Sequence, residues 1–268
     1  MNNSPIIKSI VENKIPCFFI SPHLDDAVLS AGDLIAYLAD KTSVHVVSIF
    51  TTASSRPYTF SAKAFLRQSG FTDALQLFEA RKLEDNEVLK SLGVKGTHLN
   101  FVDAALRKRK NLNNIVSRIA KLIPEFGHTY PIHRIHIHSN KIKSEDSLLI
   151  EEISHALRKI VEGKKQFVVF CPLATNTHID HVLTRKICEG IFEHPILWSD
   201  FPYNSTWEVC SPSNDMELFT MDFDRKKKLA AILGYKTQVK AMFPSGEVPL
   251  KPERFFVPQA IISKYSVL

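Results

Sequence analysis

Short apolar runs alternate along this chain with longer segments whose apolar residues recur every three or four positions. The short runs, rich in β-branched and aromatic side chains, predict buried strands, and the longer segments predict amphipathic helices. The predicted strands cover residues 16–20, 43–50, 98–102, 134–138, 166–171 and 196–198. The predicted helices cover residues 26–39, 72–92, 111–123, 147–161, 181–192 and 224–242. This alternation predicts one α/β domain over residues 1–268, with a mainly parallel sheet between layers of helices.

Three segments fit this pattern less simply. Residues 51–70 show no clear period and predict a long loop after the second strand, where loops are often functional. The tail from Pro244 predicts only short extended pieces. The alternating segment Arg134-Ile-His-Ile-His138 predicts a strand with His136 and His138 on one face. A solvated or hydrogen-bonded strand face explains these histidines better than a second metal site.

Composition indicates an ordinary globular protein. The 268 residues are 44% hydrophobic and 23% charged, with no apolar run near the ~20 residues of a membrane helix. The first residues lack the features of a secretory signal, so the cytoplasm is the expected location. The net charge of +6 is mild, and the basic clusters at 107–110 and 225–228 predict solvated surface rather than nucleic-acid binding. Homo-oligomerisation stays possible.

The four cysteines have no CxxC spacing, which predicts neither a disulfide framework nor a thiolate zinc site. Histidine and aspartate are more informative. The segment Pro22-His-Leu-Asp-Asp26 directly follows the first predicted strand, at the end where open α/β sheets bind ligands. A histidine and aspartates at this spacing are candidate ligands for a divalent metal. Taken alone, however, the motif is explained better if Asp25 or Asp26 caps the next helix.

A second polar loop changes that balance. His178-Ile-Asp-His181 follows the predicted strand 166–171 in the same way. If both strands are parallel, the two loops open at the same edge of the sheet, and their side chains converge. Capping does not explain such convergence, so the pair of loops predicts a metal site. A metal-dependent glycosyltransferase and a non-catalytic sugar-binding protein are the alternatives.

The two loops together resemble the PIG-L/LmbE-like family of zinc-dependent N-acetylglucosaminyl deacetylases. Weaker matches follow in chain order: Arg81-Lys-Leu-Glu84 with Leu92-Gly-Val94, Asp103 to Arg107, Asp200 to Tyr203, and Tyr235 to Gln238. The resemblance implies a Rossmann-like three-layer sandwich with its site at the carboxyl ends of the strands. It implies Zn²⁺, or another divalent transition metal, held by His23, Asp26 and His181.

The same resemblance implies the catalytic roles. Asp25 would be the general base, His178 would stabilise the oxyanion or act as an acid, and Asp180 would orient His178 or His181. Zinc with three protein ligands and an open position lowers the pKa of bound water to ~7 and polarises a carbonyl. The resemblance thus implies a metal-dependent hydrolase that removes an N-acetyl or related N-acyl group from an amino sugar in a small molecule or glycoconjugate.

Four residues are candidates for substrate binding: Arg81, Asp103, Arg107 and Tyr203. Each has a structural alternative. Arg81 would pair with an acidic residue of its own helix, at 84 or 85. Asp103 and Arg107 would form a turn-capping pair. Core packing is the favoured role for Tyr203.

The chain departs from the family pattern at three places. Leu24 stands where the family usually has proline, and Ala27 stands where it usually has glutamate. Neither position is a metal ligand, so these changes leave the expected metal site intact. The family's Thr-x-Gly turn is missing from the segment 51–54, which implies a different pocket shape and leaves the N-acylated substrate open.

Overall fold

A single seven-stranded sheet organises the chain. The structure, a computed structural model, describes residues 4–174, 178–203 and 213–266. The strands are β1 (Cys17–Ser21), β2 (Val44–Thr52), β3 (Lys95–Val102), β4 (Val168–Pro172), β5 (Ile196–Trp198), β6 (Met216–Met221) and β7 (Glu253–Pro258). Their order in the sheet is β3-β2-β1-β4-β5-β7-β6. The first five in this order are parallel, and β7 runs antiparallel to both β5 and β6. The predicted, mainly parallel sheet is confirmed.

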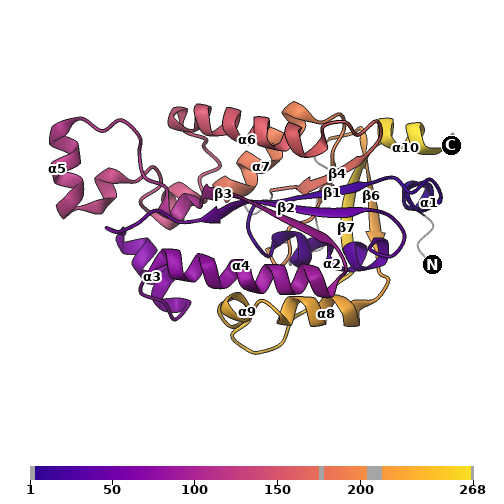
Figure 1. Cartoon of the computed structure of the whole chain (residues 1–268), viewed down its shortest axis with the longest axis horizontal. Coiled ribbons are helices and arrows are strands. Elements are labelled where there is room, and N and C mark those ends of the chain that lie inside the picture. The colour runs from indigo at the N-terminus through magenta and orange to yellow at the C-terminus, as the bar shows by residue number, and fades with distance from the viewer. Residues whose placement is uncertain (1–3, 175–177, 204–212, 267–268) are drawn as a thin grey trace.

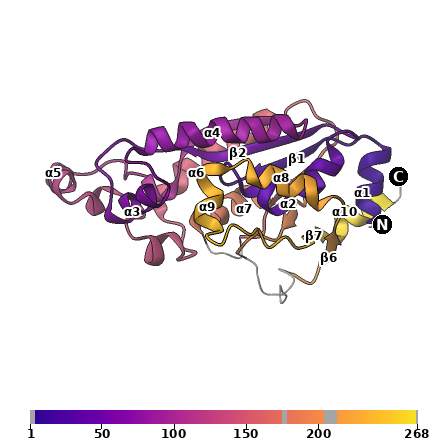
Figure 2. The same ribbon diagram turned by 90° about the horizontal axis from the view of Figure 1, so that it is seen from below.

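Helices cover both faces of this sheet (Figures 1 and 2). They are α1 (Pro5–Glu12), α2 (Asp26–Leu38), α3 (Phe60–Gln68), α4 (Ala74–Ser91), α5 (Asn114–Leu122), α6 (Ser147–Val161), α7 (Ile179–Ile191), α8 (Arg225–Leu233), α9 (Lys236–Met242) and α10 (Gln259–Ser266). One face packs against α6 and α7, and the other against α1, α2, α4 and the helices near the C-terminus. The three-layer sandwich is therefore confirmed. Among the described residues, no helix is long and apolar enough to cross a membrane.

The sequence of strand β1 is continuously apolar because its side chains are buried on both faces of the sheet. Phe18 and Ile20 point into the core under α6 and α7, while Phe19 points into the core under α2. Phe19 stacks on Phe170 of β4 with ring centroids 4.4 Å apart. Because each face of the sheet meets a layer of helices, successive residues of β1 are all buried, as expected for a central parallel strand.

Strands β1 and β4 are direct neighbours, and this places the two polar loops together. They pair in parallel, with Cys17 opposite Val168 and Phe19 opposite Phe170. The chain continues from β1 to β2 on one side, and from β4 to β5 on the other. The order of the strands thus reverses between β1 and β4, at the kind of crevice where α/β sheets bind ligands.

Two local predictions are wrong. The segment 134–138 is not a strand but lies in a π-helical turn, η3 (His133–Ile137). Ile135 is 63% exposed whereas Ile137 is 1% exposed, so the alternating sequence does not produce the two faces of a strand. The segment 51–70 is only partly a loop, because β2 extends to Thr52 and α3 begins after Thr59, whose side chain accepts a hydrogen bond from the Ala62 N–H.

The predicted helix 224–242 is broken into α8 and α9 at Gly234 and Tyr235. A Cβ atom on Gly234 would lie 2.4 Å from Val88 Cγ2 of α4, so only glycine allows this close approach. The sequence pattern also did not predict α1 or β6. In the tail, the expected extended pieces correspond to β7, which is followed by α10.

Candidate metal centre and active site

In the turn after β1, the carboxylates of Asp25 and Asp26 do not cap the following helix α2. Asp25 occupies the N-cap position of α2, but its side chain makes no capping hydrogen bond. Instead, Ser21 Oγ accepts a hydrogen bond of 3.0 Å from the Ala27 N–H. Asp26 Oδ2 accepts one of 2.9 Å from the backbone N–H of His23, which closes the turn. The capping interpretation of this motif is therefore wrong, and both aspartates face the site.

Asp26 lies between two imidazoles from different loops. Its Oδ2 is 3.0 Å from Nδ1 of His23 and 3.2 Å from Nε2 of His181. One ligand atom from each of the three residues lies within 4.8 Å of the others, and all three side chains are buried. Two imidazoles and one carboxylate at this spacing are the donor set of a catalytic zinc site, which keeps a position open for water or substrate. The residues present therefore fit Zn²⁺.

The outer nitrogen of each imidazole contacts a further carboxylate. Asp180 Oδ2 is 3.3 Å from His23 Nε2, and Asp200 Oδ1 is 2.8 Å from His181 Nδ1. Such outer carboxylates fix the orientation and tautomer of metal-binding histidines. Asp200 lies in the segment 200–203 that resembles the family, but no role in the site was predicted for it. Its position two residues beyond β5, at the same edge of the parallel sheet, is the signal that identifies it.

The carboxylates produce a strongly negative environment for the two imidazoles. Burial lowers the pKa of His181, but Asp26 and Asp200 outweigh burial and raise it to about 9. Burial also lowers the pKa of His23, but hydrogen bonds to Asp180 and Asp26 raise it well above its ordinary value. An environment that favours protons on both rings favours a cation bound between them, with which protons compete.

Asp180 has a different partner from the expected one. It was predicted to orient His178 or His181, but the ring beside its carboxylate is that of His23. Its position is fixed by Arg107, 2.5 Å from Oδ1, and by the backbone N–H of Ala104, 2.8 Å from Oδ2. His23, His178 and Asp180 form a second group that could hold a metal, but both Asp180 oxygens already accept these hydrogen bonds.

Arg107, which helps to hold Asp180 in position, is itself buried. It donates to the carbonyl of Val102 and to Asp180, and lies 3.4 Å from Asp146. The expected capping pair with Asp103 is not formed. Asp103 instead caps the short helix η1 (Ala104–Leu106) by itself, and its Oδ2 lies 3.4 Å from His23 Nε2. The basic cluster 107–110 is thus not uniformly solvated surface.

Asp25 differs from Asp26 in both position and pKa. Its Oδ1 lies 3.4 Å from Nη2 of Arg81 on α4. Burial raises the pKa of Asp25 to about 6, with Arg81 opposing this shift and Asp26 adding to it. Burial also raises the pKa of Asp26, but His181 and His23 outweigh it and hold that pKa well below its usual range. Neighbouring carboxylates with separated pKa values are typical of acid–base sites.

Arg81 does not form the expected ion pair within its own helix. Asp85 accepts hydrogen bonds from His98 and Tyr235, at 2.7 Å each, and Glu84 contacts Thr237. Arg81 is directed to Asp25 across the site instead. Its buried Nε has no hydrogen-bond partner among the described residues.

His178 and Tyr203 lie around the two metal-binding rings. His178 Nδ1 accepts a hydrogen bond of 3.3 Å from the Asp180 N–H, and its ring centroid is 5.1 Å from that of His23. Tyr203 is 53% exposed, with its ring 6.4 Å from that of His181. The favoured prediction of core packing for Tyr203 is therefore wrong. Residues 175–177, directly before His178, lie outside the described residues.

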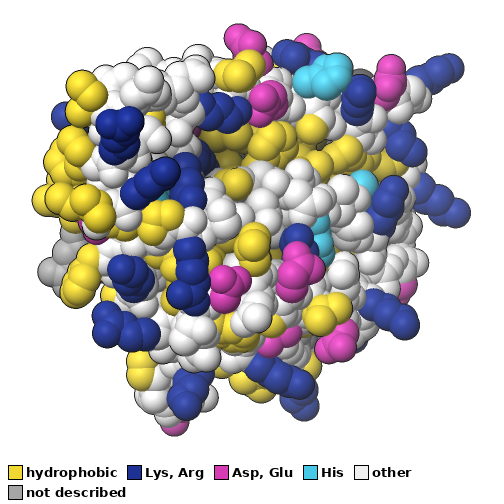
Figure 3. Space-filling model, turned by 60° about the vertical axis from the view of Figure 1, so that its left-hand side comes forward, with side chains coloured by type: hydrophobic (Ala, Val, Ile, Leu, Met, Phe, Trp, Pro, Cys, Tyr) yellow, Lys and Arg dark blue, Asp and Glu magenta, His cyan; other side chains and the backbone are white. Residues whose placement is uncertain are grey.

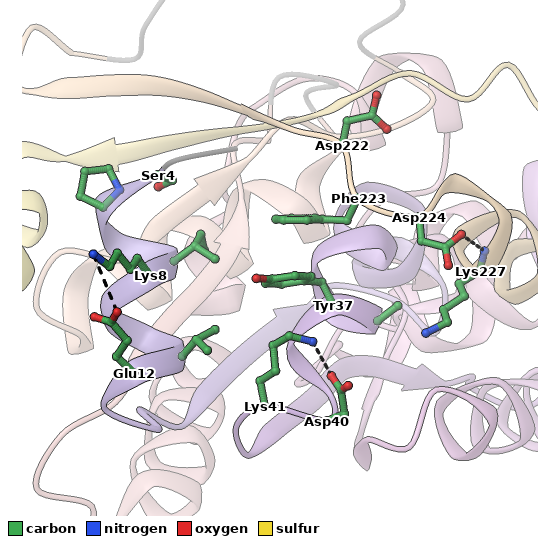
Figure 4. Close-up of a pocket in the computed structure, with 14 residues that line it drawn as sticks. Ser4, Lys8, Glu12, Tyr37, Asp40, Lys41, Asp222, Phe223, Asp224 and Lys227 are labelled. Atoms are coloured by element: carbon green, nitrogen blue, oxygen red, sulfur yellow. Dashed lines mark hydrogen bonds and ion pairs between the residues drawn. The ribbon is translucent and has the colours of Figure 1, made fainter. Parts of the chain in front are cut away.

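A separate groove of about 1150 Å³ lies between α1, α2 and the start of α8. Tyr37 and Phe223 stack in it with centroids 3.9 Å apart (Figure 4). Lys8 pairs with Glu12, and Lys41 with Asp40. None of the metal-site residues lines this groove.

The fold and site define a class of protein. An open α/β sandwich with a buried pair of histidines and an aspartate at its strand ends, and a second aspartate beside them, has the residues that a metal-dependent hydrolase requires. The match to a family model supports this and makes it specific. Residues 18–192 match the PIG-L family, described as GlcNAc-PI de-N-acetylase. The chain belongs to the PIG-L family of deacetylases, and the expected metal-dependent hydrolase is confirmed in preference to a glycosyltransferase.

Individual relatives agree with this assignment. The chain is 26% identical over 252 residues to 2'-N-acetylparomamine deacetylase of Niallia circulans, which covers 87% of this chain and 84% of that protein. Its fold resembles that of the deacetylase–teicoplanin complex from teicoplanin biosynthesis, with a TM-score of 0.70, 24% identity and coverage of 90% and 97% of the two chains. It also resembles the zinc-inhibited form of teicoplanin deacetylase, with a TM-score of 0.67, 22% identity and coverage of 90% and 97%.

Proposed function

We propose that this protein hydrolyses the N-acetyl group of an amino sugar within a small molecule or glycoconjugate. The observation that carries the proposal is the position of Asp26. Its Oδ2 contacts both His23 and His181, while its neighbour Asp25, in the same site, contacts Arg81 instead. Metal binding and proton transfer are thereby separated between adjacent residues.

His23, Asp26 and His181 would hold Zn²⁺, which when bound would act as a Lewis acid toward water and the acyl carbonyl. The chain's own residues do the rest. Asp180 and Asp200 hold the two rings in orientation. Asp25 accepts a proton from the attacking water, for which a carboxylate with a raised pKa is suited. Arg81 keeps Asp25 in place through a charge-assisted contact.

His178 is proposed to stabilise the oxyanion as a neutral hydrogen-bond donor. Its Nδ1 accepts a hydrogen bond from the backbone, which leaves the ring proton on Nε2. Burial is the main cause that lowers the pKa of His178 well below its ordinary value, and the nearby His23 adds to this shift. Of the two roles that the resemblance implies, this supports a neutral ring that stabilises the oxyanion rather than a protonated ring that acts as an acid. When the C–N bond breaks, the proton on Asp25 passes to the leaving nitrogen, and acetate and the free amine are released.

Contact with the sugar is assigned to side chains at the edge of the site. The exposed ring of Tyr203 is the best placed of the four candidates to pack against a sugar ring. Arg81 and Asp103 border the reacting centre through Asp25 and His23. The guanidinium of Arg107 has protein partners on three sides, so we propose that it positions Asp180 instead of binding substrate.

The test measures amine and acetate release from a panel of N-acetylated amino sugars, including N-acetylglucosamine and N-acetylated aminoglycosides. We expect Asp25→Asn and His181→Ala to abolish turnover, and chelation to remove it reversibly. His155→Ala, on the exposed side of α6, and Asp222→Asn are matched controls that should retain activity. Turnover that persists in the Asp25 and His181 variants, or in chelator, would refute the proposal.

We also propose that residues 1–268 form one domain that works in the cytoplasm. Strands from residue 17 to residue 258 share one sheet, which supports the first point. Three buried cysteines are free thiols, namely Cys17, Cys171 and Cys188, which supports the second. Cys210 lies outside the described residues. Limited proteolysis tests the domain, and cell fractionation tests the location.

A further inference from the structure

Ser30 lies one helical turn after Asp26 in α2, and residues four positions apart are neighbours on the same side of a helix. The Ser30 side chain is 3% exposed, and its Oγ accepts a hydrogen bond of 3.1 Å from the backbone N–H of Phe201. One side of α2 therefore carries a metal-site aspartate at its start. One turn later it carries the anchor of a segment that lies 171 residues away in the chain.

The segment anchored in this way, residues 200–203, contributes two side chains to the site. Asp200 Oδ1 lies 2.8 Å from Nδ1 of His181, and the ring of Tyr203 lies 6.4 Å from the His181 ring. On the opposite nitrogen of the same ring, Nε2 lies 3.2 Å from Oδ2 of Asp26. Both nitrogens of His181 thus contact carboxylates that come from α2 itself or from the segment that α2 anchors.

A buried ion pair supports Phe201 through its aromatic ring. Lys228 Nζ lies 2.7 Å from Glu253 Oε1 and 5.5 Å from the centroid of the Phe201 ring, a distance typical of a cation–π contact. Figure 3 shows Lys and Arg side chains that extend from the surface into solvent, whereas Lys228 is only 3% exposed. Phe201 is therefore held at its backbone by Ser30 and at its ring by a buried cation.

Glu253 also stabilises a break in α2 that directly follows Ser30. Ala31 departs from helical geometry, with a φ of −131° and a ψ of 18°. Beyond the break, the Glu253 carboxylate accepts hydrogen bonds from the backbone N–H groups of Asp33, at 2.8 Å, and Leu34, at 3.0 Å. N–H groups at the start of a helical segment need such acceptors. The first part of α2, from the metal site to the break, is thus fixed at both ends.

We propose that Ser30 is a positioning residue of the metal site. Its hydroxyl fixes the segment 200–203, which in turn orients the His181 ring for zinc and sets the Tyr203 ring beside it. The effect through Tyr203 rests on the proposed deacetylation, because it concerns the substrate, whereas the effect on zinc does not. If Ser30 only satisfied the Phe201 N–H, it would contribute to the free energy of unfolding and to nothing else.

The experiment compares the wild type with Ser30→Ala, which removes the acceptor, and Ser30→Thr, which keeps a hydroxyl on the same carbon. Zinc affinity is measured by competition with a chromophoric chelator, and kcat and KM with the best N-acetylated amino sugar of the panel. We expect Ser30→Ala to bind zinc roughly three- to tenfold more weakly and to raise KM, and Ser30→Thr to recover most of both. Ser154→Ala is the matched control, because Ser154 is a buried serine of α6.

Two outcomes would overturn the proposal. One is an unchanged zinc affinity in Ser30→Ala, whether or not its melting temperature falls, because a purely structural serine affects stability alone. The other is an equal loss of zinc affinity in Ser154→Ala. If Ser30→Ala does not fold, Ser30→Cys replaces it, since its sulfur is a weak acceptor, and should bind zinc more weakly than the wild type. If the wild type hydrolyses no substrate of the panel, the proposed function fails, while zinc affinity still decides the role of Ser30.

Discussion

Asp200 offers the sharpest test of how the metal site is built. Its carboxylate is fully buried, 2.8 Å from Nδ1 of His181, and has no place among the proposed metal ligands. Asp200→Asn keeps the size and an accepting oxygen but removes the negative charge. Asp200→Ala also removes the acceptor, so the imidazole loses both its orientation and its hydrogen-bond partner.

The structure sets the size of the expected effect. Loss of an outer carboxylate on a metal-binding histidine typically lowers metal affinity or activity about 10- to 100-fold. This corresponds to roughly 1.4–2.7 kcal/mol. Asp200→Asn should lie near the lower limit because the hydrogen bond survives. Asp200→Ala should lie near the upper limit, since a buried N–H is then left unsatisfied.

The assay is competition for zinc against a chromophoric chelator, together with kcat/KM for the best substrate of the panel. Zinc affinity separates positioning from a general loss of folding, which is followed independently by thermal unfolding. Asp222→Asn, far from the site on the surface groove, is the control. If Asp200→Ala binds zinc as tightly as the wild type and retains full activity, the inference that Asp200 positions His181 is wrong.

Three further predictions concern stability. Glu253→Ala leaves the buried Lys228 ammonium, 2.7 Å from the carboxylate, without its partner and should lower the free energy of unfolding by about 3–5 kcal/mol in urea titrations. Gly234→Ala places a Cβ 2.4 Å from Val88 Cγ2 and should cost about 1–3 kcal/mol, less in combination with Val88→Ala, as a double-mutant cycle in urea would measure. Burial, with two nearby lysines, lowers the pKa of His45 from 6.5 to about 4, so the unfolded chain binds the proton more readily. The free energy of unfolding should therefore fall as pH drops from about 6.5 toward 4, by at most about 3 kcal/mol. The difference between the urea midpoints at pH 7 and pH 4.5 should be smaller in His45→Gln than in the wild type.

Much of the architecture was predictable because it depends on local patterns. Strands with helical layers on both faces need continuous apolar runs, and residues 17–20 and 168–171 show them. The segment 134–138 was mispredicted because alternation of Ile and His does not distinguish a strand from the π-helical turn found there, in which Ile137 is buried and Ile135 is exposed. The break at Gly234 depends on a side chain of α4, far away in the chain, so periodicity within residues 224–242 does not indicate it.

The sequence by itself determined which residue types stand at the ends of two buried strands, and hence that a site for a divalent metal was to be expected. Only the tertiary structure decided how those residues are arranged around one another. Pairing of β1 with β4 brings Asp26 between His23 and His181, and Ser21 takes over the helix cap from Asp25. The physical reason is that ligand geometry, burial and electrostatic coupling join groups separated by more than a hundred residues, whereas sequence periodicity reports only on neighbours along the chain.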